Sequence, residues 1–457
     1  MSTAAAPGGM TGTPSGPGAH RRRGRLRRWL RPGTGLAGWL LVVLTGQLIL
    51  AVAGAFLIRL VFRDVPDDSL AGQVFGVVSL QFLPGLLRPL VVLLVGLGIF
   101  LYGLRRLLGV LLEPLPARSV PLAELVYQKR SLARGPRVVA IGGGTGISTL
   151  LRGLKEVTSN ITAIVTVADD GGSSGKLREE LGIAPVGDLR SCITALADAE
   201  PVMTELLSYR FHPDREDAGL AGHAFGNLLI AALSEIAGDF EEGVRLTNRV
   251  LAVRGRVVPV APVPLTLHAE LADGTQLEGQ SRIMRAPAIR RVWISPAAVE
   301  ASADAVEAIR EADIIVLGPG SLFTSLLPSL LVPGIRSALD AASGIRAWVC
   351  NVATQPGETE GYTLAAHLAA LDAHGVGDLI DVVIANDNLD ARRAADYPAA
   401  PVRIDLDPAR TRPRLVRADV VDDANAHRHD PAKLTAALVA LVEERHASRA
   451  PSAARIA

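Results

Sequence analysis

Residues 138–146 read Val-Val-Ala-Ile-Gly-Gly-Gly-Thr-Gly, and this stretch decides the fold. A short apolar run stops at a glycine-rich turn, and a helical spacing of leucines begins at Leu150. This pattern predicts a buried strand, a tight turn and the first turn of a helix. Glycines let the backbone approach a ligand closely, and the free N–H groups at a helix start attract phosphate. The stretch therefore predicts a loop that binds a phosphorylated ligand.

A second loop of the same kind follows the apolar run 161–167, where residues 168–176 read Ala-Asp-Asp-Gly-Gly-Ser-Ser-Gly-Lys. Consecutive parallel strands end at one sheet edge, so we expect both loops to face one ligand. The first loop has Ile147 where a dinucleotide fingerprint has its third glycine, and it lacks the Lys of a P-loop after Gly146. An NAD-dependent enzyme stays open as an alternative, and a Walker-type NTPase is disfavoured.

The composition points to a membrane segment in addition to a large folded body. Of 457 residues, 49% are hydrophobic and only 4% aromatic. Residues 1–63 contain nine arginines and no acid, which leaves 38 basic and 46 acidic residues, a net −8, for the rest. This acidic body argues against nucleic-acid binding. Cys192 and Cys350 stand far apart, which excludes a disulfide framework and disfavours a zinc site.

The sequence before the body predicts a membrane hairpin. Residues 1–35 form a basic tail that we expect to be disordered. The uncharged run 36–58 and the shorter run 87–104 predict two transmembrane helices of a hairpin over 36–106. Arginines flank both outer ends, so the positive-inside rule places the N-terminus and the body in the cytoplasm, tethered to the cell membrane. The alternatives are two buried core helices and a nucleic-acid-binding arginine tail. A proline-containing linker, 107–135, follows.

The body, 136–446, predicts a parallel α/β sheet. Strand-length apolar runs alternate there with helical patterns. Residues 266–280 alternate around an Asp-Gly pair, which predicts a small inserted β-hairpin. We expect a closing helix over 430–444 and a disordered tail over 447–457. The strand-length runs are 137–141, 162–167, 313–317, 347–352 and 380–385.

The second glycine loop carries side chains suited to a nucleotide. Asp169 and Asp170 follow the strand directly, which suits a ribose or a magnesium-bound phosphate. Asp170 is the candidate magnesium ligand, and Mg²⁺ is the only cofactor that the sequence suggests. The alternative is that one of the two acids caps the next helix. Ser173 and Ser174 can donate hydroxyl groups to phosphate oxygens.

Two further helix starts supply candidates. Asp188 is expected to be an N-cap, which places Arg190 in the first helical turn. A cation is unfavourable there unless an anion is near, so Arg190 is a candidate phosphate contact. His223 and Asn227 share one helix face and are candidate ligand contacts. Acid–base chemistry by His223 is less favoured, since the sequence shows no nucleophile for it.

Polar loops also follow the later strand-length runs. Gly318, Gly320 and Ser321 form another glycine turn that can present amides and a hydroxyl group to an anion. Asn351 and Gln355 follow the next apolar run. Polar loops that converge at one sheet edge fit a nucleotide-like ligand with a second polar group.

Several long motifs resemble a known family. They are IGGGTGISTLLRGLK (141–155), ADDGGSSGKLREELG (168–182), GHAFGNLLIAAL (222–233) and NVATQPGETEGYT (351–363). Together they look like the gluconeogenesis factor (YvcK) branch of the CofD-like family, over about residues 136–445. The resemblance implies a Rossmann-like three-layer α/β/α core. The N-terminal hairpin departs from the typical cytoplasmic member.

The two branches imply different functions. The CofD branch is a magnesium-dependent 2-phospho-L-lactate transferase that moves a phospholactyl group from a guanosine diphosphate adduct to a deazaflavin alcohol. The YvcK branch implies binding of UDP-sugars and roles in cell shape, envelope synthesis and growth on gluconeogenic carbon. Residues 318–322 read Gly-Pro-Gly-Ser-Leu, where the transferase branch tends to carry Asn and Pro after the serine, so transferase activity is the alternative.

We therefore expect a membrane-tethered protein that binds a nucleotide sugar, with self-association into a homo-oligomer left open. The resemblance carries over to the positions that match its motifs. The predicted ligand-binding residues are Gly142, Gly143, Gly144, Thr145, Gly146, Asp169, Asp170, Ser173, Ser174, Arg190, His223, Asn227, Gly318, Gly320, Ser321, Asn351 and Gln355.

Overall fold

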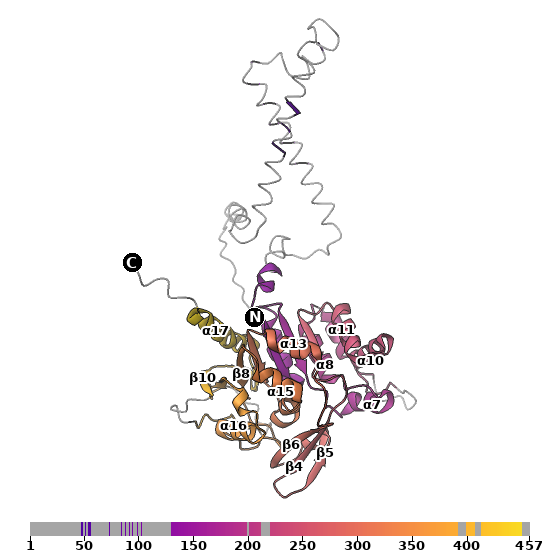
Figure 1. Ribbon diagram of the computed structural model, residues 1–457, viewed down its shortest axis with the longest axis vertical. Coiled ribbons are helices and arrows are strands. Elements are labelled where there is room, and N and C mark those ends of the chain that lie inside the picture. Colours follow the sequence, from indigo (N-terminus) through magenta and orange to yellow (C-terminus); the bar gives the residue numbers. More distant parts are fainter. Residues whose placement is uncertain are drawn as a thin grey trace, which may run out of the picture. The chain divides into compact units, whose positions relative to one another are not determined.

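The computed structural model describes residues 129–198, 201–211, 220–391, 399–406 and 413–449, with single residues between 47 and 102. The chain divides into two units, Met1–Val126 and Tyr127–Ala457 (Figure 1). The predicted basic tail lies outside the described residues, as does nearly all of the predicted transmembrane hairpin. Among the described residues no single helix is long and apolar enough to cross a membrane. One pair bent by 75°, Leu322–Leu330 with Pro333–Asp340, meets the length and composition criteria.

A seven-stranded parallel sheet forms the centre of the second unit. The strand order is β10-β9-β8-β7-β1-β2-β3, and every neighbouring pair is parallel. The predicted parallel α/β fold is therefore confirmed. The strands are β1 (Val138–Gly142), β2 (Ile161–Val165), β3 (Arg256–Pro259), β7 (Ile314–Leu317), β8 (Ile345–Val349), β9 (Val382–Asn386) and β10 (Arg414–Ala418).

The five predicted apolar runs became β1, β2, β7, β8 and β9 because strands of a parallel sheet are covered on both faces. Every residue of β1, β2, β7 and β9 is buried. The analysis missed β3, which is short and ends at a proline, and β10, which is a partly exposed edge strand. The chain order reverses between β1 and β7. Ligands of open α/β sheets bind at such a point, beyond the carboxyl ends of the strands.

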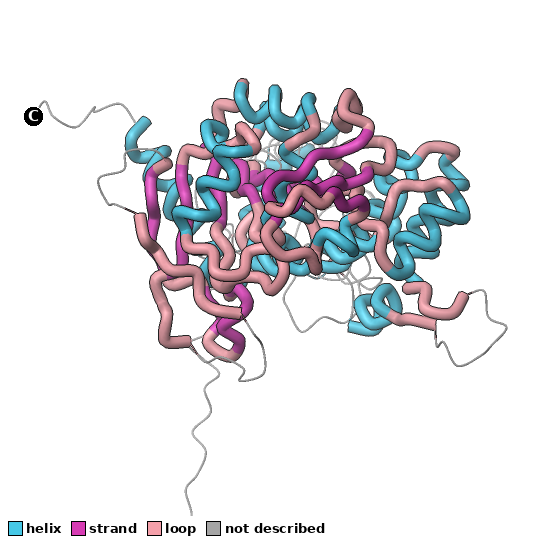
Figure 2. Tube along the Cα trace, turned by 90° about the horizontal axis from the view of Figure 1, so that it is seen from below, coloured by secondary structure: helices cyan, strands magenta, loops and turns pink. Residues whose placement is uncertain are grey.

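Helices cover both faces of the sheet (Figure 2). Helix α6 packs against α8 and α17, whereas α13 packs against α15. A single hydrophobic core runs through the sheet and these helices. The helices are α6 (Gly144–Leu154), α7 (Gly172–Leu181), α8 (Gly187–Leu196), α9 (Pro201–Ser208), α10 (Phe225–Ala237), α11 (Phe240–Val250), α12 (Gln280–Ile283), α13 (Ala303–Glu311), the π-helical turn η1 (Leu322–Leu326), α14 (Leu327–Leu330), α15 (Pro333–Asp340), α16 (Leu364–Ala373), the 3₁₀ turn η2 (Gly377–Leu379) and α17 (Pro431–Arg449).

Two small antiparallel elements accompany the main sheet. The predicted hairpin is confirmed as β4 (Thr266–Leu271) and β5 (Gln276–Glu278), and β6 (Ile289–Ser295) adds a third strand that the sequence analysis did not predict. This sheet projects at the bottom of Figure 1. The second element is a hairpin of β11 (Val421–Asp422) and β12 (Asn425–His429).

Two predicted boundaries shift. Residues 129–133 are helical and belong to the body rather than to the linker, since the Ser159 N–H donates to the Leu132 carbonyl at 3.0 Å. The predicted closing helix is confirmed as α17, but it extends to Arg449, into the predicted tail. Residues 450–457 lie outside the described residues.

Candidate functional site

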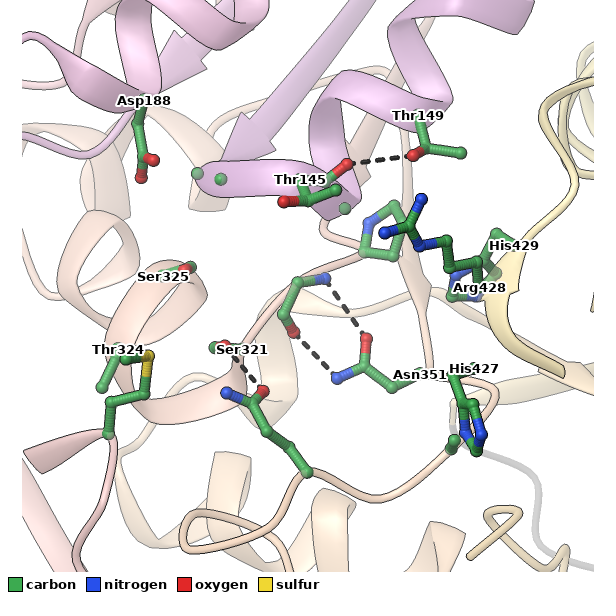
Figure 3. Close-up of a pocket in the computed structure, with 18 of the residues that line it drawn as sticks. Thr145, Thr149, Asp188, Ser321, Thr324, Ser325, Asn351, His427, Arg428 and His429 are labelled. Carbon is green, nitrogen blue, oxygen red and sulfur yellow. Dashed lines mark hydrogen bonds between the residues drawn. The ribbon is translucent and has the colours of Figure 1, made fainter. Parts of the chain in front are cut away.

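A cavity of about 500 Å³ opens at the carboxyl ends of β1 and β7, where the chain order reverses (Figure 3). Its walls come from the loops after β1, β2, β7 and β8, from the first turns of α6 and α8, and from η1, α12 and β12. The lining residues are Gly143, Gly144, Thr145, Gly146, Thr149, Asp169, Asp188, Gln280, Ser281, Met284, Pro319, Gly320, Ser321, Thr324, Ser325, Asn351, Val352, Ala353, Thr354, Gln355, His427, Arg428 and His429.

The loops after β1 and β7 pack against each other, and this contact requires glycine. A Cβ on Gly146 would lie 2.8 Å from the carbonyl carbon of Pro319 and 3.1 Å from Gly320 Cα. Gly144 has a φ of 67°, which side-chain-bearing residues rarely adopt. These glycines therefore bring two loops together, in addition to leaving room for a ligand.

Asn351 and Gln355 hold the loop after β7 in place. The Gly320 N–H donates to Asn351 Oδ1 at 3.2 Å, and Asn351 Nδ2 donates to the Gly320 carbonyl at 3.0 Å. The Ser321 hydroxyl donates to Gln355 Oε1 at 2.6 Å. Figure 3 shows both pairs at the centre of the cavity. All four predicted residues thus reach the same cavity.

Asp188 corrects one prediction and adds a site residue. It is not the N-cap of α8, because that position is Val186 and Asp188 lies in the first turn. Its carboxylate instead accepts a hydrogen bond from the Gly144 N–H at the start of α6. A Cβ on Gly143 would lie 3.4 Å from Asp188 Cγ. Part of the amide surface predicted to attract phosphate therefore already faces a carboxylate of the protein.

Asp169 lies close to Asp188 and also lines the cavity. Burial, together with the charge of Asp169, raises the pKa of Asp188 to about 7. Burial also raises the pKa of Asp169, which the Gly171 N–H and the Ser174 hydroxyl oppose by hydrogen bonding. Two neighbouring carboxylates at a cavity wall can accept hydrogen bonds from hydroxyl groups or hold a divalent cation.

The π-helical turn η1 supplies Thr324 and Ser325 to the cavity wall. Glu358, which is 1% exposed, accepts hydrogen bonds from the Thr324 hydroxyl and, at 3.4 Å, from the Phe323 N–H. Burial raises the pKa of Glu358 to about 7. Gln280 donates to the Thr324 carbonyl at 3.0 Å and ties α12 to the same turn. Isolated π-turns often occur at functional sites.

Sequence reasoning missed the contribution of β12. This strand brings His427, Arg428 and His429 to the cavity, and His427 lies 281 residues beyond Gly146 of the first glycine loop (427 − 146). His429 lies within hydrogen-bonding distance of the Cys350 carbonyl, 3.2 Å from Nε2, and burial lowers its pKa to about 4. The sequence analysis found no motif in this segment.

A second group of predicted residues lies away from the cavity lining. Ser173, His223 and Asn227 are at most 4% exposed. Ser173 Oγ accepts hydrogen bonds from Asn227 Nδ2 at 3.0 Å and from the Ala224 N–H at 3.3 Å. Its own proton is therefore left for His223 Nδ1, at 3.2 Å. His223 thus has a hydroxyl partner, where the sequence showed no nucleophile for it. This partner is sealed in the interior, where the network fixes α7 against α10.

Three more predicted residues have structural contacts outside the lining. Asp170 Oδ1 accepts hydrogen bonds from the Ser281 N–H at 2.8 Å and the Ser281 hydroxyl at 2.7 Å, which secures the start of α12. Ser174 Oγ accepts a hydrogen bond from the Gly187 N–H at 3.0 Å. Arg190 packs on Gly226, and burial, with the charge of Arg210, lowers its pKa.

The remaining predicted glycines, Gly142 and Gly318, lie at the strand ends beneath the loops. A Cβ on Gly142 would lie 3.8 Å from Gly318 Cα. The structure therefore brings nine of the predicted residues into one lining: Gly143, Gly144, Thr145, Gly146, Asp169, Gly320, Ser321, Asn351 and Gln355.

Known proteins show the same architecture. Residues 138–421 match the family model described as 2-phospho-L-lactate transferase CofD. A solved structure of a UPF0052 family member from Bacillus halodurans is 41% identical. It superimposes with a TM-score of 0.62 and covers 67% of this chain and 99% of its own.

Two curated relatives carry a more specific name. A putative gluconeogenesis factor from Nostoc is 43% identical over 422 residues, which is 90% of this chain and 91% of the relative. The gluconeogenesis factor of Bacillus subtilis is 42% identical over 321 residues, 68% of this chain and 100% of the relative. The chain therefore belongs to the CofD family, in the branch whose members are named gluconeogenesis factors.

Proposed function

We propose that this protein binds a nucleotide sugar of the UDP-sugar class and regulates cell shape, envelope synthesis and central carbon use from the membrane. The observation that carries the proposal is the 500 Å³ cavity at the reversal point of the sheet. Open α/β sheets bind nucleotides at this position. The lining combines amides, hydroxyl groups, two carboxylates and an arginine, which suits a ligand with phosphates and many hydroxyl groups.

Ligand competition in calorimetry tests this proposal. UDP-glucose should bind the full chain in a one-to-one complex, and GDP and NAD should bind at least tenfold more weakly. A ligand at 100 times its dissociation constant stabilises the folded state by about 2.7 kcal/mol, so a thermal shift should rank the three ligands in the same order. Preferential binding of NAD would instead favour the dinucleotide alternative.

The second candidate function is magnesium-dependent phospholactyl transfer. The family match and the Asp169–Asp188 pair favour it, since Mg²⁺ often uses one or two carboxylates together with substrate phosphates. These two residues fit the ion better than Asp170, whose Oδ1 is engaged by Ser281. Bound Mg²⁺ would neutralise phosphate charge, and Asp169 and Asp188 would hold and orient it. The phospholactyl group takes one of the two phosphates of the guanosine diphosphate adduct, so release of GMP in the presence of a deazaflavin alcohol would identify this activity.

The membrane attachment is a proposal from the sequence of the first unit. The Nostoc relative matches 90% of this chain, which is more than the residues from Tyr127 onward can supply, so part of the first unit is shared with it. We propose that the hairpin 36–106 holds the cavity at the cytoplasmic face. A cysteine introduced near Asp67 should be labelled from the side of the membrane opposite the cytoplasm in sealed vesicles. Labelling from the cytoplasmic side would refute this topology.

A further inference from the structure

Basic side chains gather at the amino end of the sheet, which is the end opposite the ligand cavity. Four of them are exposed just before β1, and the fifth opens the edge strand β3. This group, which we call the basic face, consists of Lys129, Arg130, Arg134, Arg137 and Arg256. Residues 64–457 as a whole carry a net charge of −8, so the basic face is a local exception on an acidic body.

The body holds this face in place. The helical turn 129–133, drawn in violet above the sheet in Figure 1, is tied to the segment that leads into β2. The Ser159 N–H donates to the Leu132 carbonyl at 3.0 Å, and Asn160 Nδ2 donates to the Gly135 carbonyl at 2.8 Å. The cations of this turn therefore keep a fixed position on the body.

A hollow of about 280 Å³ lies beside the turn, at the amino ends of β1, β2 and β3. Arg137 and Arg256 line it, together with Asn160. Arg256 Nε donates to the Thr162 hydroxyl at 3.1 Å, and in the described part of the chain no carboxylate lies within ion-pair distance of the Arg256 guanidinium group. A guanidinium group has five N–H donors, so Arg256 has donors left for an anion.

The acids near the face do not cancel its charge. Asp313 lies 3.5 Å and Glu311 3.9 Å from Arg137, and such exposed pairs contribute little because water and salt screen them. Glu311 is the only acid among the described residues that line the hollow, against two arginines. The hollow therefore keeps a net positive charge.

We propose that the basic face binds the phosphate groups of anionic phospholipids, so that the body docks on the membrane with its ligand cavity turned towards the cytoplasm. The face begins shortly after the predicted membrane hairpin 36–106, and Lys and Arg clusters on the cytoplasmic side of a membrane segment bind anionic lipid. This inference rests on the proposed membrane attachment and adds the face of the body that meets the lipid.

The two ends of the sheet can bind different anions independently. The five residues of β1 separate them by about 16 Å. This distance exceeds the screening length of about 8 Å in physiological salt. Lipid charge at the basic face therefore leaves the charges of the ligand cavity nearly undisturbed.

Energy transfer from the full chain to headgroup-labelled lipid tests the inference. A donor fluorophore on Ser131→Cys marks the basic face, and one on Ala272→Cys, in the turn between β4 and β5, marks the opposite end of the body in Figure 1. The native cysteines, Cys192 and Cys350, are buried and stay unlabelled.

Transfer from the Ser131→Cys label should be several-fold higher in vesicles that contain phosphatidylglycerol than in vesicles of neutral phosphatidylcholine. Salt at about 1 M shortens the screening length to about 3 Å and should abolish this difference. Transfer from the Ala272→Cys label should not depend on lipid charge.

Charge variants locate the effect. Lys129→Glu combined with Arg137→Gln should remove most of the transfer that depends on phosphatidylglycerol and leave the affinity for UDP-glucose unchanged. The matched control is Arg417→Glu, which alters an exposed arginine on β10 outside the basic face and should leave both quantities unchanged. Equal thermal unfolding of these variants excludes a folding defect.

Two results would overturn the inference. One is equal transfer from the Ser131→Cys label in both kinds of vesicle, which would favour an acidic partner protein at this face. The other is larger transfer from the Ala272→Cys label, which would place the opposite end of the body at the membrane.

Flotation with neutral vesicles judges the proposed membrane attachment separately. A chain that does not float with neutral vesicles, but still shows transfer that depends on phosphatidylglycerol, would refute the attachment and support the basic face. A chain that floats with neutral vesicles, but shows no dependence on lipid charge, would support the attachment and refute the basic face.

Discussion

Two polar clusters of this body arise from the same sequence pattern and have opposite roles. The loops after β1 and β7 and the residues Asp169 and Asp188 line a cavity of about 500 Å³. Ser173, His223 and Asn227 follow glycines at helix starts in the same way, yet they close on one another in the interior. Glycine and polar residues at a helix start thus mark either a ligand loop or a buried clamp. The two clusters differ in whether their side chains are open to the cavity, and the sequence pattern does not specify this.

The sharpest test of the cavity is Gly146→Ala. Because the new Cβ would lie 2.8 Å from the Pro319 carbonyl carbon, the loops after β1 and β7 must separate. We expect a loss of about 3 kcal/mol in the free energy of unfolding and at least tenfold weaker UDP-glucose binding. Denaturant titration and calorimetry measure the two effects. Gly144→Ala is the comparison, since it meets no atom within 3.4 Å and should cost about 1 kcal/mol through its φ of 67°.

Ser173→Ala tests the buried hydrogen-bond network of Ser173, His223 and Asn227. Removal of the hydroxyl leaves Asn227 Nδ2, the Ala224 N–H and His223 Nδ1 without this partner. The free energy of unfolding should fall by about 2 kcal/mol, while the affinity for UDP-glucose should stay within a factor of two. Denaturant titration and calorimetry again report both quantities. A large loss of affinity with unchanged stability would place Ser173 in the ligand site and remove the distinction between the clusters.

Asp188→Asn tests the cost of a buried carboxylate at the cavity wall. The pKa of Asp188 is about 7 in the folded state against 3.8 ordinarily, so the folded state holds more protons between these values. The wild-type free energy of unfolding should therefore fall, relative to that of the variant, as pH rises from about 4 to 7, and level off above 7. We expect a relative change of roughly 2–3 kcal/mol between pH 5 and 8, since the folded state loses its proton over about two pH units at 1.36 kcal/mol each. A constant difference across this range would contradict the raised pKa.

The smallest expected effect separates the neighbours Asp169 and Asp170. Asp169→Asn should weaken UDP-glucose binding several-fold in Mg²⁺ and less in EDTA, since an amide is a poorer ligand for a hard cation. Asp170→Asn should leave affinity nearly unchanged and lower stability by about 1 kcal/mol, through its hydrogen bonds to Ser281. The reverse result would return the metal-ligand role to Asp170.

The sequence by itself determined the fold class and nine of the 23 residues that line the cavity. Buried runs such as 138–141 and 314–317 predict parallel strands because both faces of such a sheet are covered, which favours a nearly continuous apolar run. Glycine turns at the ends of these strands then predict loops at one edge. This local reasoning brought Gly143 to Gly146, Asp169, Gly320 and Ser321 to one edge of the sheet, where they line the same cavity.

Only the tertiary structure decided which polar residues reach the cavity. Asp188 belongs to α8 but accepts a hydrogen bond from the start of α6, and Arg428 arrives from β12, far along the chain. Ser173 and His223 turn inward because α10 packs over the start of α7. Packing fixes these directions, since a helix or strand pattern specifies which face a residue occupies but not which neighbour covers that face.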